Sequence, residues 1–389
     1  MTTDPTPGTH TAGRIDFADT GGVTSALNWT ARGLTPERAW RALCRTYASE
    51  AAGHQHDYVK LLVNGEFVRD HESWPTRETD TEGFSAWLER QQSISARDDV
   101  FVFARTVQEH DRDLFRTLVE LVAPHLHALG LAPGHVEAEV FYGAYRNTPG
   151  GIHREGCTNL HLVLGGRKSM HFWRGTDWIP AGTALREDIE PEAGHPEEYL
   201  PELGLAEALP HGHSLTATGG GGYFWRSGIW HVGETHEPSI ALNIASYTKT
   251  LDVEAKLLTP WAERVHGDVP PEWLRQYREH TSFTGDDAAL LARLTALGMR
   301  PAPAGPGGGS PSKVRMVSTA PVVWSARPTG GLTVATLGHS AVFADTPSLR
   351  AWLDRALASP GAVGAVPEDC RGLARWLCAQ QILEPLETT

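Results

Sequence analysis

The spacing of hydrophobic residues divides the chain into a first part with helical periodicity and a later part with strand-like alternation. In the first part, three stretches place apolar residues three and four positions apart, which predicts amphipathic helices. Apolar runs on both sides of Asn64-Gly65 predict a β-hairpin between the first two helices. Thr35 and Pro36 can start the first helix as its N-cap and first residue. The three helical stretches are 35–49, 83–93 and 111–131.

From Val136 onward the pattern changes to that of short strands. Six segments rich in β-branched and aromatic residues, separated by glycine and proline turns, favour a β-sandwich or barrel. The acidic segment 186–204 interrupts them and is interpreted as a long insertion or surface loop. The six segments are 135–147, 159–165, 168–175, 214–220, 221–233 and 239–250.

The remainder of the chain predicts helices, a linker and a small separate module. Helical spacing returns over 270–280 and 286–299, and the next residues are mostly glycine, proline, alanine and serine, as in linkers. Three strands and two helices then predict an α+β module, for which a winged-helix-like arrangement is one of several packings. The expected domains are a disordered N-terminus (1–25), a β-rich domain with N-terminal α/β elements (26–260), a helical segment (261–300), a linker (301–312) and the module (313–389).

Composition and charge narrow the classes of function. The chain has 389 residues, of which 40% are hydrophobic, and a formal net charge of −13, which opposes binding to phosphate-rich nucleic acid. It has no apolar run of about 18 residues and no signal-peptide pattern, so a cytoplasmic protein that does not act at membranes is expected. Four irregularly spaced cysteines predict reduced thiols rather than a zinc site.

His153, Glu155 and His231 are the candidates for a metal site. Residues two apart in a strand share a face, so His153 and Glu155 can point at the same atom. His231 follows 78 residues later (231 − 153) in another strand-like region. Two histidines and one carboxylate on one face of an octahedron form the facial triad of non-haem Fe(II) oxygenases. A lone H-x-E pair is more often a solvated strand edge, so the surrounding residues decide between these readings.

The residues around the pair favour the metal site. Gly165 and Gly166 favour a hairpin or a close approach of backbone segments, and a hairpin can bring Lys168, fifteen residues after His153, back beside the metal. Its ammonium group can hold the far carboxylate of a ligand that chelates the metal. Asn159 and Asn243 offer amide groups to the same ligand.

Residues 148–173 and 223–246 together resemble the core of the JmjC-type cupin oxygenases, and the first stretch is similar to bacterial ribosomal-protein hydroxylases and to an asparaginyl hydroxylase. The resemblance covers about residues 136–250 and implies a double-stranded β-helix fold with Fe(II), 2-oxoglutarate as co-substrate and O₂. It implies that His153, Glu155 and His231 bind iron and that Lys168 binds the distal carboxylate of 2-oxoglutarate. Asn159 and Asn243 match amides that line the co-substrate pocket.

Two positions depart from the family pattern. Glu155 stands where aspartate is commoner, and its longer side chain shifts the metal. The hydroxyl group that usually assists the lysine is unassigned, with Tyr142, Tyr145 and Thr158 as candidates. Tyr142 and Tyr145 lie on opposite strand faces, so only one of them can point inward.

The resulting hypothesis is a 2-oxoglutarate-dependent dioxygenase that hydroxylates an amino-acid side chain in a peptide or protein. The carboxylate ligand leaves no vacant position for chloride, which favours hydroxylation over halogenation. Three alternatives stay open: a hydroxylase of a free or carrier-bound amino acid in natural-product biosynthesis, a cupin metal protein without oxygenase activity, and an interaction protein built around the C-terminal module. That module is expected to dock the substrate polypeptide or to form a homodimer interface.

Overall fold

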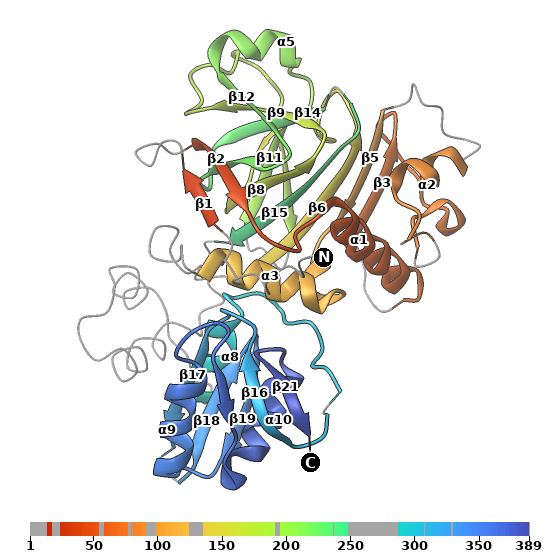
Figure 1. Ribbon diagram of the computed structural model, residues 1–389. Coiled ribbons are helices and arrows are strands. Elements are labelled where there is room, and N and C mark those ends of the chain that lie inside the picture. Colours follow the sequence, from red (N-terminus) through yellow and green to blue (C-terminus); the bar gives the residue numbers. More distant parts are fainter. Residues whose placement is uncertain are drawn as a thin grey trace, which may run out of the picture. The chain divides into compact units, whose positions relative to one another are not determined.

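The computed structural model divides the chain into two compact units, described separately below (Figure 1). One unit is formed by described residues between positions 14 and 114 and between 135 and 247, the other by those of 115–123 and 287–388. The helix predicted over 270–280 and most of the N-terminus expected to be disordered lie outside the described residues. Described are residues 14–17, 24–53, 58–76, 79, 81–90, 99–123, 135–190, 195–235, 237–247, 287–306, 308–327 and 330–388.

The first unit is built mainly of strands, which form two antiparallel sheets. Its helices are α1 (Pro36–Ala51), α2 (Phe84–Arg90) and the short α5 (Leu205–Ala208), and α3 (Arg112–Val122) begins in it. The strands are β1 (Arg14–Phe17), β2 (Thr24–Thr30), β3 (Val59–Val63), β4 (Glu66–Phe67), β5 (Val100–Ala104), β6 (Val136–Ala144), β7 (Ile152–Arg154), β8 (Cys157–Gly165), β9 (Arg167–Trp173), β10 (Arg186–Glu190), β11 (His195–Leu200), β12 (His213–Thr218), β13 (Gly221–Trp225), β14 (Trp230–Thr235) and β15 (Ser239–Tyr247).

The strand order is that of a double-stranded β-helix. The larger sheet runs β1-β2-β13-β8-β15-β6-β5-β3-β4, and the smaller runs β10-β11-β7-β14-β9-β12. The strands β6 to β9 and β12 to β15 contribute four neighbouring strands to each sheet, and the chain passes from one sheet to the other at most of the connections. This topology confirms the predicted fold class.

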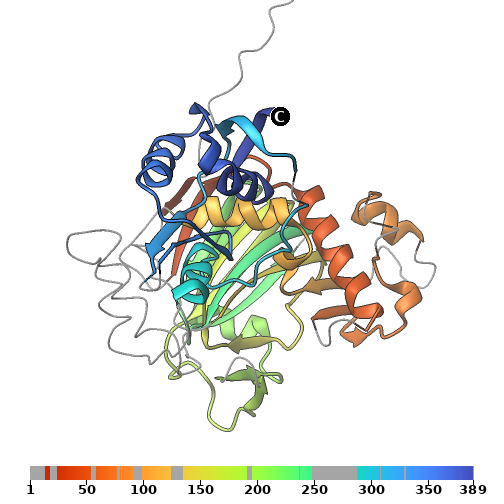
Figure 2. The ribbon, with the colours of Figure 1, turned by 90° about the horizontal axis from the view of Figure 1, so that it is seen from below.

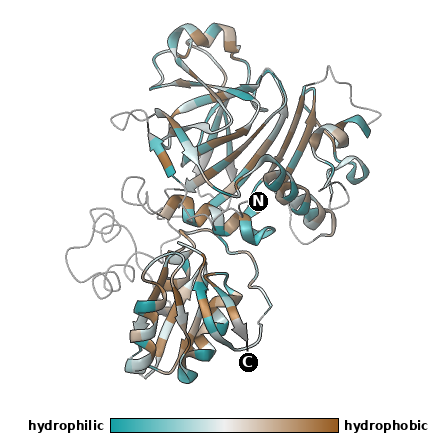
Figure 3. Ribbon diagram, viewed as in Figure 1, coloured by the Kyte–Doolittle hydropathy of each residue, from teal (hydrophilic) through white to brown (hydrophobic). Residues whose placement is uncertain are grey.

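The N-terminal elements extend and cover the larger sheet. Helix α1 lies across β15, β6, β5 and β3 (Figures 1 and 2). Thr35 caps it as predicted, since the Thr35 hydroxyl accepts a hydrogen bond from the backbone N–H of Arg38. The buried face of α1 includes Trp40, Leu43 and Tyr47, and the hydropathy colouring shows apolar positions along the sheets and one side of this helix (Figure 3). Burying this face holds α1 on the sheet.

Three local predictions were wrong, and two of the errors concern the crossing between sheets. Segment 221–233 is two strands in different sheets, β13 and β14, separated by a turn. The acidic segment 186–204 is largely a β-hairpin, β10–β11, that extends the smaller sheet. Gly165-Gly166 forms no hairpin, because β8 and β9 belong to different sheets; a Cβ on Gly166 would lie 2.4 Å from the carbonyl oxygen of Pro238.

The second unit contains the α+β elements of 313–389 together with α8 and residues from 301–312, which the sequence pattern assigned to a separate helical segment and a linker. It holds two three-stranded sheets, β20-β16-β21 and β17-β18-β19. Helix α8 packs on β17, β18 and β19, and α10 packs on β16 and β21. The single strand predicted over 332–344 is a hairpin that turns at Leu337-Gly338. The elements are α8 (Asp287–Thr295), β16 (Pro311–Met316), β17 (Val322–Ala326), β18 (Leu332–Thr336), β19 (His339–Phe343), α9 (Pro347–Ala356), β20 (Val363–Ala365), α10 (Arg371–Ala379) and β21 (Leu383–Thr388).

Replacing Gly143 by alanine is expected to lower the free energy of unfolding by about 3 kcal/mol. Gly143 has a φ of +146° in β6, and an added Cβ would lie 1.9 Å from the backbone oxygen of Val100 in β5. The control is Gly53→Ala, because Gly53 has a φ of +76° but no atom within 4 Å of the added Cβ. Its expected cost is about 1 kcal/mol. Urea denaturation of both variants tests this, and equal losses would contradict it.

Candidate metal and co-substrate site

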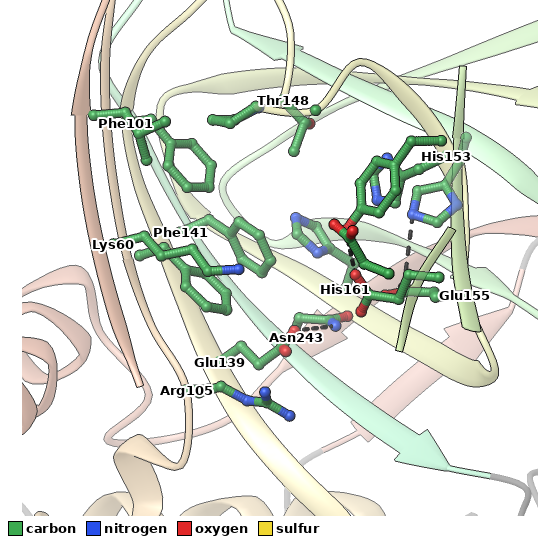
Figure 4. A pocket seen from close by; sticks show the side chains of 18 of the residues that line it. Lys60, Phe101, Arg105, Glu139, Phe141, Thr148, His153, Glu155, His161 and Asn243 are labelled. Carbon is green, nitrogen blue, oxygen red and sulfur yellow. Dashed lines mark hydrogen bonds and ion pairs between the residues drawn. The ribbon is translucent and has the colours of Figure 1, made fainter. Parts of the chain in front are cut away.

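A cavity of about 540 Å³ lies in the first unit and is lined by both sheets. Polar side chains line it from β7, β9 and β14 on one side and from β6, β8 and β15 on the other, and further ones come from β3, from the β10–β11 hairpin and from connecting segments (Figure 4). Phe101, Phe103 and Phe141 line it as well. The cavity therefore combines an apolar wall with many titratable groups of both charge signs.

His153 and His231 face each other across neighbouring strands. They are register partners in β7 and β14, and their ring centroids are 4.3 Å apart. The Nδ1 atom of each ring lies 2.9 Å from a backbone carbonyl oxygen, that of Gly151 or of Ile229. A carbonyl only accepts, so each Nδ1 carries the proton and each Nε2 keeps its lone pair for a metal. Burial lowers the pKa of both imidazoles and keeps them neutral.

Glu155 completes the predicted donor set. It follows the end of β7, and its Oε1 atom lies 3.6 Å from Nε2 of His231. The same oxygen accepts a hydrogen bond of 2.9 Å from Nδ2 of Asn159. Two neutral imidazoles and one oriented carboxylate fit a divalent iron site in donor chemistry. Across the described part of the chain, however, no three His, Cys, Asp or Glu side chains are placed so that together they could hold a metal ion.

Asn159 and Asn243 form a buried chain of hydrogen bonds that links the carboxylate of Glu155 to that of Glu139. Nδ2 of Asn243 donates to Oδ1 of Asn159 at 2.6 Å and to Oε2 of Glu139 at 2.8 Å. Burial, reinforced by the charges of Glu137 and Glu155, raises the pKa of Glu139 well above its usual range. Asn243 lines the cavity, whereas Asn159 acts on it through Glu155.

Lys168 reaches the same cavity from β9. Its side chain is buried, with Nζ 4.7 Å from the ring centroid of Phe141 and 5.7 Å from that of Tyr145. Desolvation lowers the pKa of Lys168 to about 7, against the opposing effect of the Glu139 charge. A buried cation above aromatic rings is suited to an anionic ligand group.

The proposed hydroxyl partners of Lys168 do not line this cavity as formed by the described residues, although the ring of Tyr145 lies 5.7 Å from Nζ of Lys168. Tyr142 packs on the far face of the sheet against Trp40 and Phe84, with ring centroids 5.5 and 4.0 Å away. The hydroxyl of Thr158 accepts from the backbone N–H of Ser227. Tyr145 packs on Phe101. None of Tyr142, Tyr145 and Thr158 lines the cavity as formed by the described residues.

The acidic hairpin supplies a contact that the sequence pattern did not reveal. Tyr199 of β11 is the register partner of His153, and the two rings stack with centroids 5.5 Å apart. The guanidinium carbon of Arg186 lies over the Tyr199 ring, 4.5 Å from its centroid. This stack holds the His153 ring in place. The sequence offered one indication of this contact: Tyr199 is the single aromatic residue in the acidic segment 186–204.

The strand order and the site define a cupin-type double-stranded β-helix with two histidines and one glutamate in its cavity. No family model and no curated protein matches the chain. Similar solved structures include YcfD, a ribosomal oxygenase from Escherichia coli (TM-score 0.43, 11% identity, 96% of this chain and 94% of that chain covered). The same protein in complex with cobalt and succinic acid gives a TM-score of 0.41 at 11% identity, with 86% and 88% covered.

A mutant of the oxalate decarboxylase OxdC from Bacillus subtilis is also similar, with a TM-score of 0.21, 10% identity and 49% and 38% of the two chains covered. The fold class rests on the chain's own strand order. In the described residues, no helix is long and apolar enough to cross a membrane.

Proposed function

We propose that this protein is an Fe(II)- and 2-oxoglutarate-dependent dioxygenase that hydroxylates an amino-acid side chain in a peptide or protein. The observation that carries the proposal is the meeting of His153, Glu155, His231 and Lys168 in one cavity. The first three offer the donor types of a facial triad, and the fourth offers a buried cation for the distal carboxylate of the co-substrate.

Each side chain has a defined task in this proposal. His153 and His231 present their Nε2 atoms, because their Nδ1–H groups are held by backbone carbonyls. Asn159 fixes the carboxylate of Glu155. Bound Fe(II) would supply the activation of O₂ that oxidation of a C–H bond requires.

A polypeptide substrate is supported by a second cavity of about 550 Å³ next to the first. The two share Leu62, Gly65, Phe101 and the loop 148–150 in their linings, so they are neighbouring compartments. The second is lined by polar groups such as Asn64, Asp99 and Asn147, which suit a peptide backbone. A free amino acid would occupy only the first compartment.

The proposal is tested by adding 2-oxoglutarate to the Fe(II)-loaded protein without oxygen. A 2-oxo acid that chelates Fe(II) gives a weak charge-transfer absorption in the visible range, and we expect this absorption from the wild-type protein. Its absence would rule out the oxygenase function. If it appears, mass spectrometry of cellular peptides incubated with the enzyme and O₂ should detect the gain of one oxygen atom.

The affinity for 2-oxoglutarate is expected to fall as the pH rises above about 7. Below the pKa of Lys168, the ammonium group is already present. Above this pKa, the neutral amine of Lys168 must take up a proton when the anionic ligand binds. The Kd therefore rises by up to about tenfold per pH unit. Calorimetric titration across neutral pH measures this. Lys168→Arg, whose charge does not titrate in this range, is the control with a flat profile; an equally flat wild-type profile would contradict the expectation.

A further inference from the structure

His161 is a buried polar side chain that the proposed function has not used. It lies in β8, is 2% exposed and lines the main cavity (Figure 4). Neither of its ring nitrogens has a hydrogen-bond partner among the described residues. Its cross-strand neighbour Asn243, whose interaction with the ring opposes the lowering of the His161 pKa, also leaves Oδ1 without a partner at full hydrogen-bond geometry there. A buried imidazole without partners costs free energy unless a ligand satisfies it.

Hydroxyl groups cannot take the place of the imidazole as donors to a ligand. Among the described residues that line the cavity, the hydroxyls are those of Thr148, Tyr199 and Tyr247. Thr148 donates to the carbonyl of Gly233 at 3.1 Å. The other two donate to carboxylates, Tyr199 to Glu197 and Tyr247 to Glu137. All three protons are therefore already used inside the protein.

His161 and Lys168 border the same part of the cavity. The Phe141 ring centroid is 5.4 Å from that of His161 and 4.7 Å from Nζ of Lys168. The charge of Lys168 is, after burial, the main cause that lowers the pKa of His161, so this ring is neutral and carries one N–H donor. The unpaired indole N–H of Trp225 lies instead beside His231, with ring centroids 4.9 Å apart, at the metal end.

We propose that His161 is a further binding residue for the co-substrate and donates its N–H to the distal carboxylate that Lys168 also holds. This inference rests on the proposed function. It assigns to an imidazole the part that a hydroxyl group was expected to play. The attraction between the lysine and the carboxylate has little directional preference. A hydrogen bond from a neutral N–H beside the lysine would fix the position of one carboxylate oxygen.

The test compares two ligands on three proteins by calorimetry, with Mn(II) in place of iron. The ligands are 2-oxoglutarate and 2-oxopentanoate, in which a methyl group replaces the distal carboxylate. His161→Phe is expected to weaken 2-oxoglutarate binding at least about tenfold and to leave 2-oxopentanoate binding and Mn(II) binding unchanged. His161→Gln keeps an N–H donor and should recover most of the affinity for 2-oxoglutarate.

The possible outcomes separate the inference from the proposed function. If His161→Phe weakens both ligands equally, or neither, the carboxylate contact is refuted while the oxygenase function stands. If the wild-type protein binds no 2-oxoglutarate, both are refuted. Should the phenylalanine variant fail to fold, as judged by its circular dichroism melt, nitrogen NMR of histidine-labelled wild type decides. A ring signal absent from His161→Gln must shift with 2-oxoglutarate and not with 2-oxopentanoate.

Discussion

Replacing His231 by alanine is expected to weaken Fe(II) binding by more than about 100-fold and to abolish the visible absorption given by Fe(II) and 2-oxoglutarate. Loss of a partner that only orients a metal ligand already costs 10–100-fold in affinity, so loss of a ligand should cost more. His231 is 4% exposed and faces both His153 and Glu155, so its removal takes away one of three donors. Equilibrium dialysis with Fe(II) under anaerobic conditions measures the effect.

The matched control for this variant is His171→Ala. His171 is also a buried histidine of the smaller sheet, in β9, but its Nδ1 lies 2.6 Å from the hydroxyl of Ser214. It does not line the cavity formed by the described residues. We expect His171→Ala to bind Fe(II) as the wild type does. Equal loss in both variants would mean that His231 acts through stability rather than as a ligand.

Replacing Lys168 by methionine should weaken 2-oxoglutarate binding by about 100-fold and leave Fe(II) binding intact. Removing one member of a buried charge pair costs 2–5 kcal/mol, and 100-fold corresponds to about 2.7 kcal/mol. Methionine keeps the length and the apolar packing of the side chain against Phe141. Calorimetric titration of the Mn(II)-loaded variant gives the Kd.

Lys60→Met is the control for the charge itself. Lys60 also lines the cavity, but it lies on β3, with Nζ 5.7 Å from the ring centroid of Phe103. Loss of this cation should change the Kd for 2-oxoglutarate little. If both lysine variants weaken binding equally, the summed electrostatic potential of the cavity attracts the anion. A specific contact between Lys168 and the carboxylate would then be contradicted.

Local signals in the sequence predicted local structure well. Thr35 caps α1, and Asn64 and Gly65 adopt positive φ values of 53° and 85° in the predicted hairpin between β3 and β4. These elements depend on a few neighbouring residues, whose side chains and backbone preferences act over one turn. The choice of sheet for each strand depends on distant parts of the chain. For this reason 221–233 was read as one strand and Gly165-Gly166 as a hairpin.

Four residues proposed from the sequence line one cavity, whereas the surroundings of that cavity were not predicted. His153, Glu155 and His231 approach one another as the resemblance implied, and Lys168 lines the same cavity. Strand parity could not place Tyr142, because the β-helix is extended by β5 and β3 and the outer face of the sheet is covered by α1 and α2. Tyr199 was missed since an acidic segment does not indicate which side chain turns inward.

The separation of the two histidines along the chain also affects how the protein folds. His153 and His231 lie 78 positions apart in the sequence (231 − 153). They become neighbours only when β7 and β14 pair, and β8, β9, β12 and β13 lie between these strands in the chain. Contacts between such distant residues form late and slow the folding of β-rich domains. A metal that binds only the closed arrangement would stabilise the native state by mass action. Iron supply during synthesis would then influence how much of the chain reaches the folded form.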